Sequence, residues 1–139
     1  ARAGTETPFY YGDYNADFSN FANLAGGEVR RTYTTWEHGS TIHERRWYAE
    51  NSLFPLRDDR FSDKWIVGDY VKQYEPNQWR LYDMIGNVWE WTKAENENQA
   101  EARGGSWKDR PKVTGASTRV YYNQWQKVIN VGFRPVIIE

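Results

Sequence analysis

The sequence predicts one small domain made of short β-strands joined by long, structured loops. Three observations support this fold. The chain has 139 residues, which is the size of a single ordinary domain. In the segment 32–62, which is charged and interspersed with aromatic residues, the apolar residues follow neither a helical nor a strand period. This segment is expected to be a long irregular loop. The clearest apolar runs, after a Gly-Asn pair at 86–87 and at 131–138, are typical of short strands.

The stretch LYDMIGNVWEW, residues 81–91, contains the strongest local signal. Gly86 and Asn87 tolerate the positive φ angles that a tight bend requires. The residues after the bend are apolar except for Glu90, which lies between Trp89 and Trp91. This pattern predicts a short buried strand that holds one carboxylate. A buried carboxylate is unfavourable unless it is paired or binds a cation, so Glu90 is expected to have a specific partner.

The remaining elements are less regular. Residues 1–31 are expected to form loops, with at most a weak helix around Phe18, Phe21 and Leu24. Short strands are expected at 65–68, at 70–76, around Tyr121 and Tyr122, and at 131–138. The polar tract 93–102, KAENENQAEA, predicts an exposed hairpin turn.

Composition limits the core and the classes of function. Aromatic residues make up 17% of the chain and all hydrophobic residues 39%, so the core must be built largely from rings whose polar groups find partners. The formal net charge of −1 gives no reason to expect nucleic acid as a partner. No stretch approaches the ~20 apolar residues of a membrane span. The absence of cysteine excludes disulfides, zinc–thiolate sites and thiol catalysis in this polypeptide.

Four ordered blocks resemble the formylglycine-generating enzyme, or sulfatase-modifying factor, superfamily. They are ARAGTETPFYYGD followed by FANLAG, PNQWRLYDMIGNVWEWT, ARGGSW and NVGFRPV, and RGGSWKDRP is similar in particular to a bacterial sulfatase-modifying-factor-like subgroup. The resemblance covers essentially the whole chain. It implies an α+β, C-type-lectin-like fold with little regular secondary structure. The family's domain is about twice as long as this chain, so residues 1–139 are expected to be the C-terminal part of a single domain.

The resemblance implies a first calcium site in the central stretch. Its ligands match the carboxylates of Asp83 and Glu90 and the carbonyl groups of Gly86 and Val88. Clustered oxygens around a tight glycine turn suit a hard cation. The alternative is that Glu90 pairs with an arginine such as Arg134, or accepts hydrogen bonds from backbone N–H groups.

A second calcium site of the family matches residues of FANLAG and FSDKW. The matching positions are Asn23 and Leu24, with Asp63 and Trp65. The alternative is the ordinary polarity of surface loops.

Catalytic members of the family hold copper(I) between two cysteines and use dioxygen to oxidise a sulfatase cysteine to formylglycine. The matching positions here are Asp109 and Thr114. Copper(I) needs soft thiolate ligands, which a carboxylate and a hydroxyl do not replace. The resemblance therefore implies no copper, and Lys108, Asp109 and Arg110 are expected to form a solvated charge cluster.

Two further groups of residues invite a functional interpretation. His38 and His43 suggest a metal site, but their spacing suits neither one helix face nor one strand face, which favours surface histidines. Related lectin-like domains present ligand-facing residues at the positions of Tyr121, Tyr122, Asn123 and Trp125. Core packing is the equal alternative for Tyr121 and Trp125.

Three functions remain open from the sequence. The first is a non-catalytic, calcium-stabilised scaffold that binds a protein, peptide or glycan. The second is an enzyme of the formylglycine-generating type whose active site is divergent or completed from elsewhere. The third is a structural subunit that is completed by a companion polypeptide or by the N-terminal part of the same domain, and it is compatible with the first. The sequence does not fix the compartment, and an extracytoplasmic bacterial location is favoured.

Overall fold

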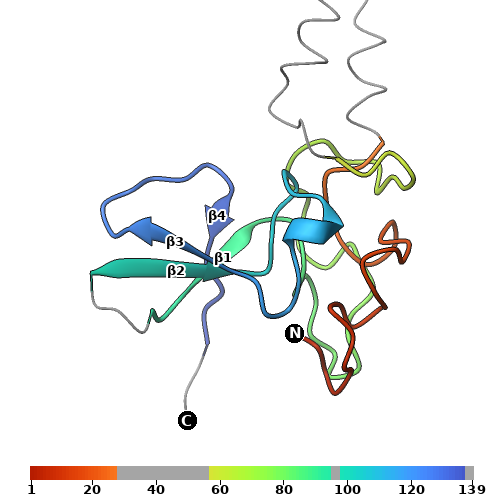
Figure 1. The fold of residues 1–139 in the computed structure, drawn as a ribbon, viewed down its shortest axis with the longest axis horizontal. Helices are drawn as coiled ribbons and strands as arrows, with labels where there is room; N and C mark the ends of the chain where they lie inside the picture. The colour runs from red at the N-terminus through yellow and green to blue at the C-terminus, as the bar shows by residue number, and fades with distance from the viewer. Residues whose placement is uncertain (28–56, 95–97, 137–139) are drawn as a thin grey trace, which may run out of the picture.

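The computed structural model describes residues 1–27, 57–94 and 98–136. These residues contain four strands and one turn of 3-10 helix: β1 Trp89–Thr92, β2 Gln99–Arg103, η1 Pro111–Val113, β3 Arg119–Asn123 and β4 Val131–Gly132. The strands lie together on one side of the molecule and the loops of 1–27 and 57–88 on the other (Figure 1). No α-helix occurs in the described ranges, so the expected α+β class is represented there by a small mixed sheet and irregular loops.

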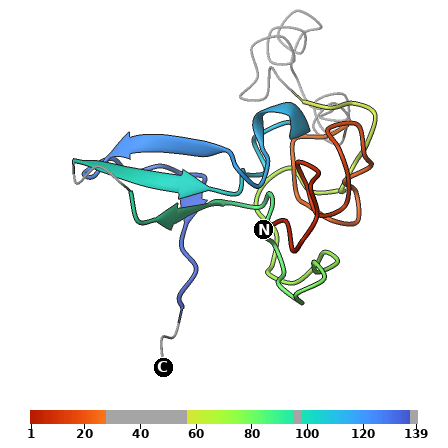
Figure 2. The ribbon, with the colours of Figure 1, turned by 60° about the horizontal axis from the view of Figure 1, so that its bottom comes forward.

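The sheet has the strand order β3-β2-β1-β4. The β1–β2 and β2–β3 pairs are antiparallel, and β4 runs parallel to β1, with Trp89 opposite Val131. The strands predicted after the Gly-Asn bend and around Tyr121 are therefore confirmed. The final strand is shorter than predicted, because the chain leaves the sheet after Gly132 (Figure 2).

The hairpin predicted from the polar tract 93–102 is present, but the tract is not all turn. Its second half forms β2, where Glu101 is only 1% exposed. The Glu101 carboxylate accepts hydrogen bonds from the Thr92 hydroxyl and from the Arg103 guanidinium. Burial acts to raise the pKa of Glu101, but these hydrogen bonds outweigh it and the pKa lies below its ordinary value. A buried, paired glutamate is therefore part of the sheet.

The main hydrophobic core lies among the loops rather than on the sheet. Its buried members are Phe9, Phe18, Ala22, Leu24 and Ile85. Ile85 comes from the central stretch, which ties that stretch to the N-terminal loops. The expected pairing of aromatic polar groups is confirmed at Tyr10, whose single O–H lies within hydrogen-bond distance of the carbonyl oxygens of Phe21 (3.0 Å) and Glu75 (2.6 Å). It is wrong at Tyr11, whose buried hydroxyl has no hydrogen-bond partner in the structure.

The strands expected at 65–68 and 70–76 are wrong. Lys64 and Lys72 adopt positive φ angles of 79° and 65°, which interrupt an extended backbone. Val67 and Val71 are exposed, so their apolar side chains do not mark the inner face of a strand. Phe18 begins only a single turn, in which its carbonyl accepts from the backbone N–H groups of residues 21 and 22.

Other predictions fall partly or wholly outside the described ranges. Most of the segment 32–62 lies there, and so do His38 and His43. Within the described ranges, no helix is long and apolar enough to cross a membrane.

Candidate functional site

The predicted bend in the central stretch is confirmed. Gly86 and Asn87 have φ angles of 78° and 63°. A Cβ atom on Gly86 would lie 2.3 Å from the carbonyl oxygen of Asn23, and the Asn87 N–H donates to that same oxygen at 2.8 Å. The bend therefore packs directly on Asn23. This contact brings the two predicted calcium sites next to each other.

The four residues of the first predicted site line one hollow of about 190 Å³. The Asp83 Oδ2 atom accepts a hydrogen bond from the Lys72 N–H at 2.7 Å. The Asp83 Oδ1 atom is buried and has no hydrogen-bond partner in the structure. Because buried polar atoms nearly always have partners, this oxygen is available to a cation.

Glu90 has the arginine partner that was the alternative to a cation. Both of its carboxylate oxygens accept hydrogen bonds from Arg134, at 2.6 to 3.0 Å. Arg134 also donates to the carbonyl oxygens of Tyr82 (3.0 Å) and Asp83 (3.2 Å). The hydrogen bonds to Glu90 raise the pKa of Arg134. A cation bound in this hollow would share the Glu90 carboxylate with Arg134.

The second predicted site is also assembled. Asp63 is buried, and its carboxylate accepts hydrogen bonds from the N–H groups of Leu24 (2.7 Å) and Trp65 (2.9 Å). Asn23 is fully buried and donates from its amide to the Val67 carbonyl at 2.9 Å. The Asn23 Oδ1 atom is buried without a partner. The structure thus brings all four predicted residues together and leaves one side-chain oxygen unsatisfied.

Sequence reasoning did not find Asp69, which lies near the same region. Its backbone exchanges hydrogen bonds with the Asn87 amide at 3.0 and 3.1 Å, and its Oδ2 atom is a third buried oxygen without a partner. Asp69 lies between the two strands expected at 65–68 and 70–76, and no local sequence pattern indicated it. In the part of the chain that the structure describes, no three His, Cys, Asp or Glu side chains converge as a metal cluster. A cation here would depend on amide and carbonyl oxygens as well as carboxylates.

Asp109 is not part of a solvated charge cluster, as had been expected. Its Oδ2 atom accepts three hydrogen bonds, from the Trp89 indole (2.8 Å), the Ser106 N–H (3.1 Å) and the Ser106 hydroxyl (2.6 Å). The Asn130 amide in turn donates to the Ser106 hydroxyl at 2.8 Å. The charge prediction is wrong here because the carboxylate accepts from Ser106, three residues away, and from the indole of Trp89, which is distant in sequence.

Thr114 is fully buried behind the same loop. Its hydroxyl donates to the Pro111 carbonyl at 3.2 Å. Gly105 lies against it so closely that a Cβ atom on Gly105 would come within 2.3 Å of the Thr114 methyl carbon. Neither Asp109 nor Thr114 offers a soft ligand, so these two positions do not fit copper(I).

The four predicted ligand-facing residues do not share one face. Tyr121 is 47% exposed and Trp125 80% exposed, so core packing is wrong for both. Asn123 is exposed on the same side of β3 as Tyr121, because alternate strand residues share a face. Tyr122 points to the opposite face and meets the Trp91 ring edge to face, with centroids 5.6 Å apart.

Comparison with known proteins assigns the chain to a family. Residues 15–138 match the model of the sulfatase-modifying factor enzyme 1-like domain, and the chain belongs to this family. It is 34% identical over 123 residues to the inactive C-alpha-formylglycine-generating enzyme 2 of Bos taurus. That alignment covers 79% of this chain and 39% of the bovine protein.

Two solved structures have a similar fold. Treponema denticola variable protein 1 superposes with a TM-score of 0.63 at 19% identity, over 96% of this chain and 41% of that protein. PvdO from Pseudomonas aeruginosa superposes with a TM-score of 0.62 at 20% identity, over 96% of this chain and 46% of that one. The chain therefore spans less than half the length of each of these three relatives.

Proposed function

We propose that this chain is a non-catalytic member of its family, a pseudoenzyme domain that acts as a binding or structural scaffold. The observation that carries the proposal is the pair Asp109 and Thr114, which stand where the resemblance places the two copper-binding cysteines. A carboxylate and a hydroxyl do not replace thiolates toward copper(I). The relative from Bos taurus is itself described as inactive, which agrees with a loss of catalysis in this family.

The surroundings of both residues support a structural role. The Asp109 carboxylate already accepts three hydrogen bonds from Trp89 and Ser106. Thr114 is buried against Gly105, and its hydroxyl donates a hydrogen bond to the Pro111 carbonyl. The Asp109 Oδ2 atom and the Thr114 hydroxyl are thus engaged in contacts within the protein, which supports a structural role for both residues.

Calcium is part of the proposal as a stabilising ion. The two predicted sites meet at the contact between Gly86 and Asn23, and each contains a buried oxygen without a hydrogen-bond partner, Asn23 Oδ1 and Asp83 Oδ1. Calcium accepts carboxylate, amide and carbonyl oxygens in flexible geometry. The ion would lend rigidity to loops that carry little regular secondary structure.

The proposed scaffold is C-type-lectin-like and takes a protein, peptide or glycan ligand or a companion polypeptide. Tyr121, Asn123 and Trp125 are exposed on and beyond β3, and exposed aromatic side chains are frequent anchors in recognition. The companion is either a separate chain or the N-terminal part of the same domain.

The test is a search for formylglycine formation by mass spectrometry. A peptide with a sulfatase motif and its cysteine is incubated with the protein, copper and dioxygen. We expect no mass change beyond a protein-free control. A loss of mass characteristic of conversion of the thiol to the aldehyde would contradict the proposal and favour the alternative, an oxidase whose site is divergent or completed from elsewhere.

A matched variant makes the negative result informative. The double substitution Asp109→Cys and Thr114→Cys restores thiols at both positions and should raise the affinity for copper(I), measured by competition with a chromogenic chelator. If the unmodified protein binds copper(I) as tightly as the double variant, the interpretation of the two positions is wrong.

A further inference from the structure

A basic hollow of about 220 Å³ lies between η1 and the segment 57–60, apart from the residues of the predicted calcium sites. Three separate parts of the chain form its walls. One is the loop that carries Asn15, the second is the segment 57–60, and the third is Arg110 with the first residues of η1. None of these residues is among the predicted calcium, copper or ligand-facing positions.

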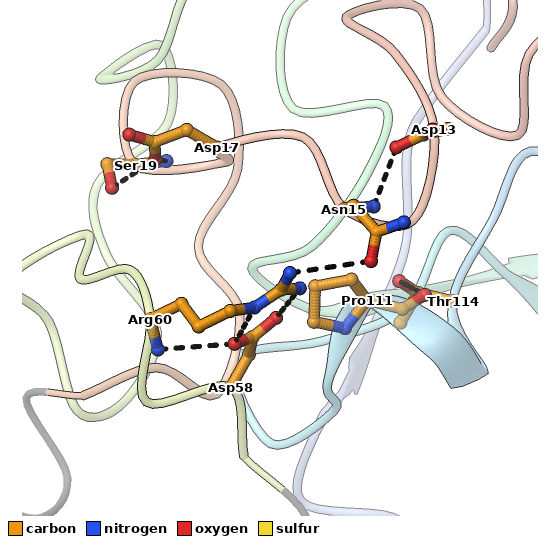
Figure 3. Close-up of polar contacts among 8 residues, drawn as sticks. All are labelled: Asp13, Asn15, Asp17, Ser19, Asp58, Arg60, Pro111 and Thr114. Atoms are coloured by element: carbon orange, nitrogen blue, oxygen red, sulfur yellow. Dashed lines mark hydrogen bonds and ion pairs between the residues drawn. The ribbon is translucent and has the colours of Figure 1, made fainter.

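Two of the four cationic side chains in the hollow are neutralised by neighbouring carboxylates. Arg60 makes a two-point contact with Asp58, at 2.8 and 2.6 Å, and its guanidinium lies between Asp58 and Asn15 with the Pro111 ring close by (Figure 3). Arg57 pairs with Asp59 at 2.7 Å. These pairs direct the two guanidinium groups toward their carboxylates.

The other two cations, Arg110 and Lys112, have no carboxylate partner among the described residues. The Arg110 Nε atom is buried without a hydrogen-bond partner, which is an unfavourable state for a charged donor. The pKa of Asp58 is lowered chiefly by its hydrogen bond from Arg60, and the charge of Lys112 adds to the effect. Lys112 is therefore close enough to act electrostatically on the hollow.

The hollow is lined by four cationic side chains, and two of them are paired with a carboxylate. Its net charge is therefore +2. Asp13, on the neighbouring loop, contributes to the field at Arg60 but does not line the hollow. The uncompensated donors belong to Arg110 and Lys112, which are one residue apart across Pro111.

The backbone fixes the two main walls relative to each other through one buried residue. The Ala25 N–H donates to the Asp109 carbonyl at 3.0 Å, and the Ala25 carbonyl accepts from the Asp58 N–H at 2.8 Å. The segments that carry Arg110 and Arg60 are thus both attached to Ala25. Pro111 has a fixed φ angle, which further limits the movement of the loop. The backbone of both walls is therefore preorganised, and the ordering required when a ligand binds is confined to side chains such as that of Lys112.

We infer that this hollow binds a tetrahedral oxyanion, a phosphate or sulfate group, with Arg110 and Lys112 as its principal donors. Two negative charges match the surplus of two positive charges. The oxygens of a phosphate or sulfate group accept charge-assisted hydrogen bonds from the buried Arg110 Nε–H and from the Lys112 ammonium at the same time. A chloride ion carries one charge and lacks this geometry.

The test is isothermal titration calorimetry of the full chain with inorganic phosphate and, separately, with sulfate, in chloride buffer of matched ionic strength. We expect both anions to bind. Arg110→Gln and Lys112→Gln should each raise the dissociation constant about tenfold or more. Lys93→Gln removes the same charge from the exposed β1–β2 connection and should leave the dissociation constant unchanged.

The two anions are distinguished by pH. Phosphate loses its second negative charge as the pH falls below neutral, whereas sulfate keeps both, so binding of phosphate alone should weaken on mild acidification.

Lys112 is exposed, so Lys112→Gln provides a folded variant even if Arg110→Gln lowers stability. The inference is overturned if neither anion binds, or if chloride at the same ionic strength abolishes the binding of both. It is also overturned if Lys112→Gln, like Lys93→Gln, leaves the dissociation constant unchanged.

Discussion

The indole N–H of Trp89 in β1 donates a 2.8 Å hydrogen bond to the carboxylate of Asp109, on the loop before η1. The same carboxylate atom also accepts from Ser106. This contact connects the sheet to the loop that carries Asp109 and Thr114, the two positions that the resemblance matches to copper-binding cysteines. It makes Asp109 a structural residue at the centre of the proposed scaffold.

Asp109→Ala is therefore expected to destabilise the protein by about 2 to 4 kcal/mol. The reason is that the Trp89 indole and the Ser106 N–H lose their acceptor in a partly dry environment. Urea unfolding monitored by tryptophan fluorescence measures the effect. Lys108→Ala, on the same loop, is the control and should change stability by less than about 0.5 kcal/mol.

A double-mutant cycle with Trp89→Phe isolates the Trp89–Asp109 interaction from cavity effects. Hydrogen bonds to charged groups contribute about 1.5 to 3 kcal/mol, so the coupling energy should be of that order. Strictly additive single and double variants would show that the two side chains do not interact in solution.

Calcium should raise the melting temperature if the two predicted sites bind it. A ligand at a hundredfold excess over its dissociation constant stabilises the folded state by about 2.7 kcal/mol. The measurement is the difference between melting temperatures in calcium and in chelator. Asp83→Asn and Glu90→Gln should both reduce this difference.

The difference is the useful quantity because Glu90→Gln also weakens the contact with Arg134, in calcium and in chelator alike. Arg134→Gln is the matched control: it removes the same ion pair but leaves the carboxylate, so it should lower both melting temperatures and preserve the calcium response. Identical melting curves of the unmodified protein in calcium and in chelator would exclude a stabilising ion.

Gly86→Ala should be among the most destabilising alanine substitutions in the chain, with an expected loss above about 2 kcal/mol. The added Cβ atom meets both an unfavourable φ of 78° and the Asn23 carbonyl oxygen at 2.3 Å. Gly4 has a comparable φ of 93° but open space around it. Gly4→Ala should therefore lose only the conformational part, about 1 to 2 kcal/mol. Equal losses in thermal unfolding would show that the close contact with Asn23 is unimportant.

These residues also show which features are predictable from sequence. The Gly86–Asn87 bend and the strand after it follow from local preferences, because few residue types accept two successive positive φ angles. The pairing of Glu90 with Arg134 was a stated alternative, since a buried carboxylate requires a partner.

Long-range contacts were beyond local reasoning. Asp109 lies between Lys108 and Arg110, so its sequence neighbours indicate a charged surface, whereas its carboxylate accepts from the Trp89 indole, 20 residues away. The exposed valines of 65–71 resemble a strand pattern, but positive φ angles at flanking lysines prevent it. The fold of a loop-rich protein depends on such contacts more than on periodicity.

The exposed apolar surface of the chain includes large side chains beside the first predicted calcium site. In β1, Trp89 is buried by residues of this chain and Trp91 is half-buried, so neither tryptophan is fully exposed to solvent. Large exposed apolar side chains lie instead at Val71 (71% exposed) and Phe133 (79%), which both line the hollow of the first predicted calcium site. Patches of this kind mark interaction surfaces.

We expect that residues 1–139 alone do not persist as a monomer, and that either the N-terminal part of the family domain or a partner subunit covers the surface at Val71 and Phe133. Burial of apolar surface contributes ~25 cal/mol per Å² before ordering costs, so the free energy of burying roughly 1,000 Å² exceeds the free energy of unfolding of a typical domain.

Size-exclusion chromatography with light scattering should show self-association of the isolated polypeptide, and a defined one-to-one species once the remainder of the domain is co-expressed. Phe133→Ser should weaken that association. Ile129, between β3 and β4, is 88% exposed, and Ile129→Ser should not weaken it. An isolated polypeptide that is monomeric at every concentration, with a cooperative unfolding transition, would show that these residues form a self-sufficient domain.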